Sequence, residues 1–191
     1  RYKMNQNLLI NNLITIENKN QEMLKNILLI LSGTIFLALM SQLTIPLPFT
    51  PVPITGQTFA VMFIGLVYGK KLGSSTLLTY IAAGSAGLPV FAGFSGKLPF
   101  FTPSGGYIIG FFFAALVCGY FADKGWTKSP VKLIAVLIIA HAVLYFFGLL
   151  QLNIFLPNKN VFAIGLYPFI AGDVIKMMIL SALLPIVWKF T

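Results

Sequence analysis

The sequence predicts an all-α integral membrane protein, a six-transmembrane-helix bundle with extracellular lid loops. Hydrophobic residues make up 58% of the 191 residues, charged residues make up only 9%, and the mean hydropathy is +0.90. Soluble domains carry about 25% charged residues, so much of this apolar surface must face lipid. Long continuous apolar runs favour helices over barrel strands, because a helix satisfies its backbone hydrogen bonds within one segment.

The chain divides into a short leader and a membrane domain. Residues 1–25 are rich in Asn, Gln and Lys, and their apolar pieces are too short to cross a bilayer. We expect a polar or interfacial leader there, followed by a six-helix membrane domain over residues 26–191. The predicted spans are about 26–45, 57–69, 73–86, 105–122, 130–151 and 166–189.

Proline and glycine clusters separate these spans. Prolines follow the first span between Pro46 and Pro53, and the run Gly69 to Gly73 follows the second. The second and third spans are short for a bilayer core of about 30 Å at about 1.5 Å per residue. We expect them to tilt, to stop partway, or to pack around a cavity that the loops complete.

Basic residues predict the orientation in the cell membrane. Lys97 and Lys159 lie in one set of loops, and ten basic residues lie in the other set or at the termini. This bias predicts cytoplasmic termini and outer loops at about 46–56, 87–104 and 152–165. The ten are Arg1, Lys3, Lys19, Lys25, Lys70, Lys71, Lys124, Lys128, Lys132 and Lys189.

Two predicted outer loops have unusual compositions. Prolines stiffen the segment 44–55 into an extended lid, because each fixes its own φ and restricts the residue before it. The segment 88–106 combines glycines with Phe91, Phe94, Phe100 and Phe101. That composition suits closure over a small, partly apolar ligand, although a purely structural loop is the alternative.

Asp173 and Lys176 stand three residues apart inside an apolar run from Leu166 to Val187. A charge at the centre of a span costs about 2.5–3.5 kcal/mol on insertion scales and usually faces protein or a water-filled cavity. The i, i+3 spacing places both side chains on one helical face. They can neutralise each other structurally or hold a polar ligand.

Other residues give little indication of chemistry. His141 lies in an apolar run without the sequence neighbours that a metal site or catalytic dyad requires, so a buried structural role is expected. Cys118 is interpreted as a small buried residue. The sequence shows no phosphate-binding loop or nucleophile elbow, and its scattered lysines do not form a nucleic-acid stripe. An enzyme and a nucleic-acid partner are therefore not expected.

Four motifs occur in order along the chain: IPLPFTPVPITGQT at 45–58, GLPVFAG at 87–93, TPSGGY at 102–107 and PFIAGDVIK at 168–176. Together they resemble the BioY family, the biotin-binding S components of energy-coupling factor transporters, over roughly residues 27–189. The resemblance implies a bundle that binds biotin from outside. It also implies release into the cytoplasm with a transmembrane coupling subunit and two ATPase subunits.

The sequence departs from the family in three places. Family members commonly carry a more glycine-rich loop after the Phe-Ala-Gly element, where this chain has the run FSGK at 94–97. Ser104 stands where family members commonly carry Thr, which keeps a hydroxyl. Small residues on the first family helix meet the coupling subunit; the best match is Thr34 with Ala38, continued imperfectly by Gln42.

Residue chemistry and the resemblance together predict a biotin site without a cofactor. Asp173 can accept a hydrogen bond from a ureido N–H, and Lys176 can donate to the ureido carbonyl or meet the carboxylate. The remaining candidates are Phe91 and Tyr107 as apolar walls, Gln57 and Ser104 as polar contacts, and Lys97 as an outer carboxylate partner.

Two alternatives remain open at this point. An ion-coupled secondary transporter of a small carboxylate-bearing solute would use Asp173 as its titrating group, and it would predict internal repeats. A scaffolding membrane protein would keep Asp173 and Lys176 as a structural pair and would leave the unusual loops unexplained.

Overall fold

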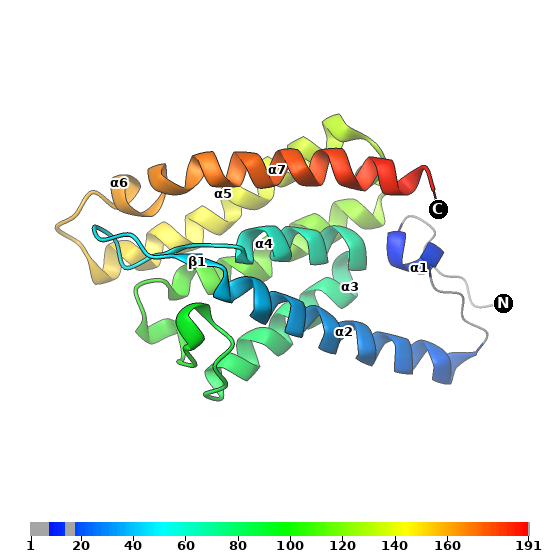
Figure 1. Cartoon of the computed structure of the whole chain (residues 1–191), viewed down its shortest axis with the longest axis horizontal. Coiled ribbons are helices and arrows are strands. Elements are labelled where there is room, and N and C mark those ends of the chain that lie inside the picture. Colours follow the sequence, from blue (N-terminus) through cyan, green and yellow to red (C-terminus); the bar gives the residue numbers. More distant parts are fainter. Residues whose placement is uncertain (1–7, 14–17, 191) are drawn as a thin grey trace.

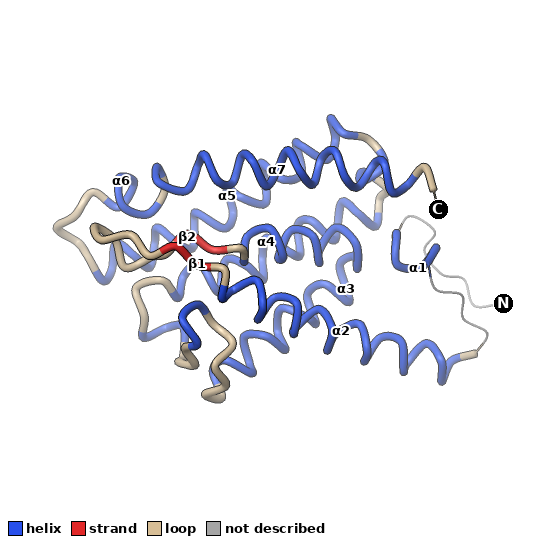
Figure 2. Tube along the Cα trace, in the orientation of Figure 1, coloured by secondary structure: helices blue, strands red, loops and turns tan. Residues whose placement is uncertain are grey.

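The computed structural model describes residues 8–13 and 18–190, and it is helical almost throughout (Figures 1 and 2). The prediction of a leader over residues 1–25 falls partly outside these ranges and stays a prediction. The main helices are α1 (Leu9–Leu13), α2 (Lys19–Gln42), α3 (Gln57–Ser85), α4 (Gly105–Asp123), α5 (Pro130–Phe155), α6 (Val161–Gly165) and α7 (Tyr167–Trp188). Two strands, β1 (Thr44–Ile45) and β2 (Ile54–Thr55), and three short 3₁₀ turns at 92–94, 99–101 and 126–128 complete the element order.

Helix α3 contains the second and third predicted spans as two arms joined at Gly69. Gly69 has φ 78° and ψ −177°, which breaks the helix and sends the chain back along itself. As a result, the Gln57 amide donates to the Tyr80 hydroxyl at 2.7 Å, although the residues are 23 apart in sequence. The arms 57–68 and 70–85 are about 18 Å and 24 Å long, both short of a full bilayer core.

The core lies where α3 packs against α4. An added Cβ on Gly65 would lie 2.7 Å from the Cys118 Cβ and 2.8 Å from the Ala115 carbonyl oxygen. An added Cβ on Gly119 would lie 2.5 Å from the Lys70 backbone nitrogen. Small residues thus let the two backbones approach each other within the membrane. Cys118 is fully buried at this contact, as predicted.

Large apolar side chains remain exposed along the outward faces of α2, α5 and α7. Among the described residues, four helical segments are long and apolar enough to cross a membrane: α2, α4, α5 and the stretch 161–188 that contains α6 and α7. Exposed apolar faces of this length require lipid contact, so the chain is a multi-pass membrane protein.

The first long helix begins earlier than the sequence predicted. α2 begins at Lys19 instead of residue 26, because the Asn18 side chain caps it by accepting from the Gln21 N–H at 2.9 Å. Lys25 is buried and donates to the Asn11 side chain at 3.1 Å, which ties α1 to α2. α2 also ends at Gln42, before the predicted residue 45, where the chain turns into β1.

The proline segment forms the tip of a β-hairpin. β1 and β2 pair antiparallel, with Thr44 opposite Thr55 and Ile45 opposite Ile54. Figures 1 and 2 show this hairpin and α6 at one end of the bundle. α1 and the C-terminal end of α7 lie at the opposite end (Figure 1).

Candidate ligand-binding site

A pocket of about 240 Å³ lies inside the bundle beneath the β-hairpin. Its walls come from the hairpin, the start of α3, the loop 86–104 and helices α4, α5 and α7. The structure brings all seven predicted site residues to this one pocket: Gln57, Phe91, Lys97, Ser104, Tyr107, Asp173 and Lys176.

Asp173 is the buried acceptor of the pocket, with only 4% of its surface exposed. One carboxylate oxygen, Oδ1, accepts from the Thr58 hydroxyl and from the Lys176 ammonium, both at 3.0 Å. The other oxygen, Oδ2, accepts from the Tyr145 hydroxyl at 2.5 Å. A carboxylate offers about four lone-pair sites, so Oδ2 retains capacity for one further donor.

Lys176 joins α7 to the hairpin and to α3. Its Nζ donates to the Thr55 carbonyl at 2.8 Å, to the Thr58 hydroxyl at 2.6 Å and to Asp173 at 3.0 Å. These three bonds use all three ammonium protons. A ligand carbonyl can therefore bind Lys176 only by replacing one of these acceptors, and the Thr55 carbonyl lies on the hairpin that covers the pocket.

Sequence reasoning missed Thr58 and Tyr145 as partners of the charged pair. Thr58 closes the first sequence motif, and Tyr145 lies on α5, 28 residues before Asp173. Both hydroxyls donate to the carboxylate inside a low-dielectric site, where charge-assisted bonds are strongest. The i, i+4 spacing of His141 and Tyr145 on one helical face was the only local signal for the α5 contribution.

His141 lies one helical turn before Tyr145 on α5 and is 7% exposed. Its Nδ1 is 2.8 Å from the Leu137 carbonyl, which can only accept, so Nδ1 carries a proton and donates it. Its Nε2 is 3.7 Å from Asp173 Oδ2. The ring is buried and hydrogen-bonded as predicted. Asp173 is an acidic neighbour in space that the sequence around His141 does not reveal, because it comes from α7.

Phe91 and Tyr107 form apolar walls of the pocket. Phe91 is 3% exposed and packs edge-on against Tyr80 at a centroid distance of 5.2 Å. Gly84 leaves room for this ring, since an added Cβ would overlap it. The Tyr107 hydroxyl donates to the Gly165 carbonyl at 2.7 Å, which leaves its ring to face the pocket.

The other predicted polar residues have different surroundings. Gln57 is buried, and its amide is bonded at both ends, to Tyr80 at 2.7 Å and to Thr55 at 3.1 Å. Lys97 is exposed and Ser104 is half-buried, and both line the pocket. Direct ligand contact by these three residues stays a prediction.

Only one of the four loop phenylalanines lines the pocket. Phe94, Phe100 and Phe101 are between 69% and 75% exposed and point away from the interior. The interpretation of the loop as a cluster of aromatic residues around a ligand therefore holds for Phe91 alone. The outward rings are instead placed to contact lipid or the membrane interface.

Helix α2 holds the loop 86–104 in place. The Ser41 hydroxyl donates to the Val90 carbonyl at 2.7 Å, and the Gln42 amide donates to the Phe91 carbonyl at 3.1 Å. Earlier on the same helix, the Thr34 hydroxyl donates to the Thr76 carbonyl of α3 at 3.4 Å. The predicted docking stripe of Thr34, Ala38 and Gln42 therefore packs at least partly within this chain.

Comparison with known proteins places this chain in a family. The sequence profile of the BioY family matches residues 10–191. The chain belongs to the BioY family.

Curated BioY relatives cover most of the chain. The probable biotin transporter BioY of Pyrococcus horikoshii is 39% identical over 66% of this chain and 74% of its own length. The biotin transporter BioY of Thermotoga maritima is 35% identical over 71% and 80%. The biotin transporter BioY of Rhizobium etli is 34% identical over 82% and 89%.

A solved structure shares the fold of this BioY chain. The crystal structure of the S-component for biotin from an ECF-type ABC transporter superposes with a TM-score of 0.79 at 30% identity. The match covers 91% of this chain and 95% of the other. Family members of this kind are transporter components and not enzymes.

Proposed function

We propose that this chain is the membrane-embedded biotin-binding subunit of a vitamin uptake system. The observation that carries the proposal is the pocket itself, in which the ion-paired Asp173 and Lys176 share one lining with the apolar walls Phe91 and Tyr107. Biotin combines a polar ureido ring with an apolar thioether ring, so one pocket must offer both surfaces. Membership in the BioY family supports the same ligand.

In this proposal Asp173 accepts from a ureido N–H through the remaining capacity of Oδ2. Lys176 binds the ureido carbonyl in exchange for the Thr55 carbonyl, which links ligand binding to the hairpin. Lys97 lies on the exposed side of the pocket and pairs with the valerate carboxylate. Ser104 and Gln57 add polar contacts around the ring.

We further propose a six-helix membrane domain made of α2, the two arms of α3, α4, α5 and α7, in which the short arms of α3 pack around the pocket without each spanning the full bilayer core. The β-hairpin and the loop 86–104 form the extracellular lid, and both termini are cytoplasmic. The basic residues concentrated at one set of loops support this orientation. In this proposal, release of biotin inside requires a separate coupling subunit and two ATPase subunits. The structural relative, described as the S-component for biotin from an ECF-type ABC transporter, supports a role as one part of a larger assembly.

A thermal-shift scan of the detergent-purified chain against a panel of vitamins tests the ligand. Biotin at a hundredfold excess over its dissociation constant should stabilise the folded state by about 2.7 kcal/mol, and other vitamins should not. A scan in which biotin gives no shift, or in which an unrelated vitamin gives the larger shift, would contradict the proposal.

Accessibility of single cysteines tests the orientation. Phe49→Cys and Asn158→Cys should react with an impermeant thiol reagent added to intact cells, because both positions are exposed on the proposed outer loops. Ser129→Cys should react only after the cells are opened. The native Cys118 is fully buried and provides a low background. Labelling of Ser129→Cys alone in intact cells would reverse the orientation.

A further inference from the structure

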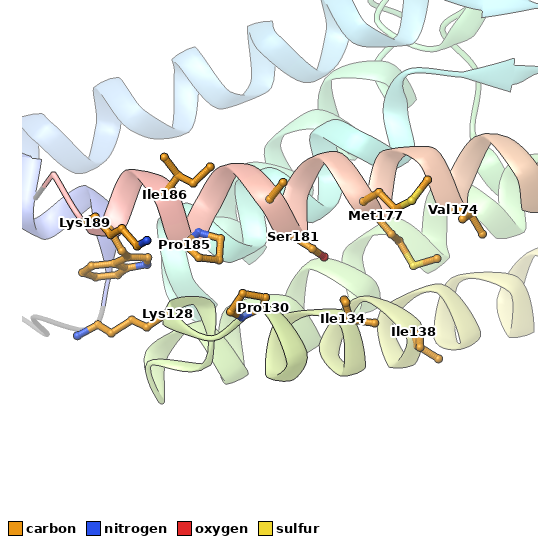
Figure 3. A pocket seen from close by; sticks show the side chains of 13 residues that line it. Lys128, Pro130, Ile134, Ile138, Val174, Met177, Ser181, Pro185, Ile186 and Lys189 are labelled. Carbon is orange, nitrogen blue, oxygen red and sulfur yellow. The ribbon is translucent and has the colours of Figure 1, made fainter.

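A second cavity, distinct from the interior pocket, opens between α5 and α7 at the surface of the bundle. It has a volume of about 1120 Å³, more than four times the 240 Å³ of the interior pocket. Figure 3 shows Ile134 and Ile138 of α5 facing Met177 and Val174 of α7 across it. These walls are aliphatic and belong to helices that are long enough to cross the membrane.

One end of this groove is basic. Lys128 and Lys189 line it together with Trp188, and the Lys128 ammonium lies 4.5 Å from the centre of the Trp188 ring. Within residues 8–13 and 18–190, neither lysine has a carboxylate oxygen within 4 Å. The two positive charges therefore remain available to an anionic group at the mouth of an apolar groove.

The middle of the groove contains an unused hydrogen-bond donor. Ser181 is 7% exposed, and its hydroxyl has no hydrogen-bond partner among the described residues. Figure 3 shows its oxygen directed across the groove toward α5. An occupant that supplies an acceptor at this depth would satisfy the hydroxyl, whereas a purely hydrocarbon occupant would leave it unpaired.

We propose that this groove binds one anionic phospholipid, with its acyl chains between α5 and α7 and its headgroup against Lys128 and Lys189. Basic pockets between membrane helices are established binding sites for anionic headgroups. The glycerol esters and upper acyl chains would lie toward Ser181, eight residues from Lys189 along α7. An ester carbonyl would supply the acceptor that its hydroxyl lacks.

Charge argues against a second copy of the chain as the occupant. The chain has a formal net charge of +9. Two copies that pack symmetrically through this groove would bring Lys128 and Lys189 of each copy toward the same residues of the other. An anionic lipid instead neutralises both lysines.

Native mass spectrometry of the full chain, titrated with phosphatidylglycerol or phosphatidylcholine, tests the proposal. The unmodified protein should retain phosphatidylglycerol in preference to phosphatidylcholine. Lys128→Gln/Lys189→Gln should lower the affinity for phosphatidylglycerol by about thirtyfold, or about fivefold for each charge. Lys71→Gln/Lys124→Gln removes the same charge outside the groove and should leave that affinity unchanged.

A groove-filling variant separates this site from general lipid adhesion. Ala182 lines the groove, so Ala182→Trp should exclude the bound lipid while circular dichroism shows unchanged helix content. Equal retention of the two lipids by the unmodified protein, or equal losses in the two lysine pairs, would overturn the proposal. So would a lipid-free dimer that Ala182→Trp dissociates, because it would identify a second copy as the occupant.

Discussion

Asp173→Asn should weaken biotin binding about ten- to a hundredfold while leaving most of the folding stability intact. Asn keeps the shape of Asp but removes its charge, so a charge-assisted bond to the ureido ring becomes a neutral one. That change corresponds to about 1.5–3 kcal/mol of binding free energy. Isothermal titration of biotin and thermal unfolding of the same sample measure the two effects.

Lys176→Met should likewise reduce affinity more than stability, because its ammonium is expected to meet the ligand carbonyl. A purely structural pair predicts the opposite order of effects. Removal of one partner would then leave an uncompensated buried charge and cost about 3–5 kcal/mol of stability. Loss of both partners would largely restore the fold and leave binding intact.

The double variant Asp173→Asn/Lys176→Met distinguishes these cases. In the binding interpretation it should bind biotin no better than either single variant. Thr58 and Tyr145 would lose their charged partner in all variants that lack Asp173, so comparison among those variants controls for their contribution. A double variant with the affinity of the unmodified protein would place the biotin site elsewhere.

The charged pair was predictable because its signal is local in sequence, whereas the other pocket residues were named through the family resemblance. Asp173 and Lys176 share a helical face within one apolar run, and the structure places them 3.0 Å apart. Thr58 and Tyr145 were not predictable in the same way. Their contact with Asp173 depends on how α3 and α5 pack against α7, and Thr58 is 115 residues away in sequence.

Helix ends were predicted less well than helix positions. The apolar pattern located the body of α2, but the polar first turns of this helix, from Lys19, lie before the apolar run begins. The break at Gly69 was predictable because glycine is favoured where φ is positive. The close packing of the two arms of α3 depends on contacts such as Gln57 with Tyr80, which no local pattern reveals.

The structure also bears on the ion-coupled alternative. Asp173 accepts hydrogen bonds from three side chains in the pocket: Thr58, Tyr145 and Lys176. These three bonds come from α3, α5 and α7 and fix the position of the carboxylate in the pocket wall. A carboxylate held in this way suits a fixed binding partner better than a proton carrier.

Gly105→Ala should destabilise the protein and abolish high-affinity biotin binding together. Gly105 begins α4 beneath the loop 86–104, and an added Cβ would overlap the Pro99 carbonyl. That carbonyl cannot move freely, because the Gln151 amide donates to it at 2.8 Å and to the Thr102 carbonyl at 2.7 Å. Overpacking of this kind costs about 1–3 kcal/mol or more.

The loss of binding follows from the position of Gly105 between two pocket residues. Ser104 precedes it, and Tyr107 follows within the first turn of α4, so a displaced helix start moves a polar contact and an apolar wall at once. Thermal unfolding and biotin titration of Gly105→Ala measure both losses.

Gly172→Ala provides the matched control for this glycine substitution. Gly172 lies inside α7 next to Asp173, and an added Cβ there has no neighbour within 4 Å. Alanine should stabilise that helix by about 0.5–1 kcal/mol and leave binding unchanged. If Gly105→Ala unfolds at the same temperature as Gly172→Ala and binds biotin equally well, then α4 and its loop do not form the rigid wall that the pocket geometry requires.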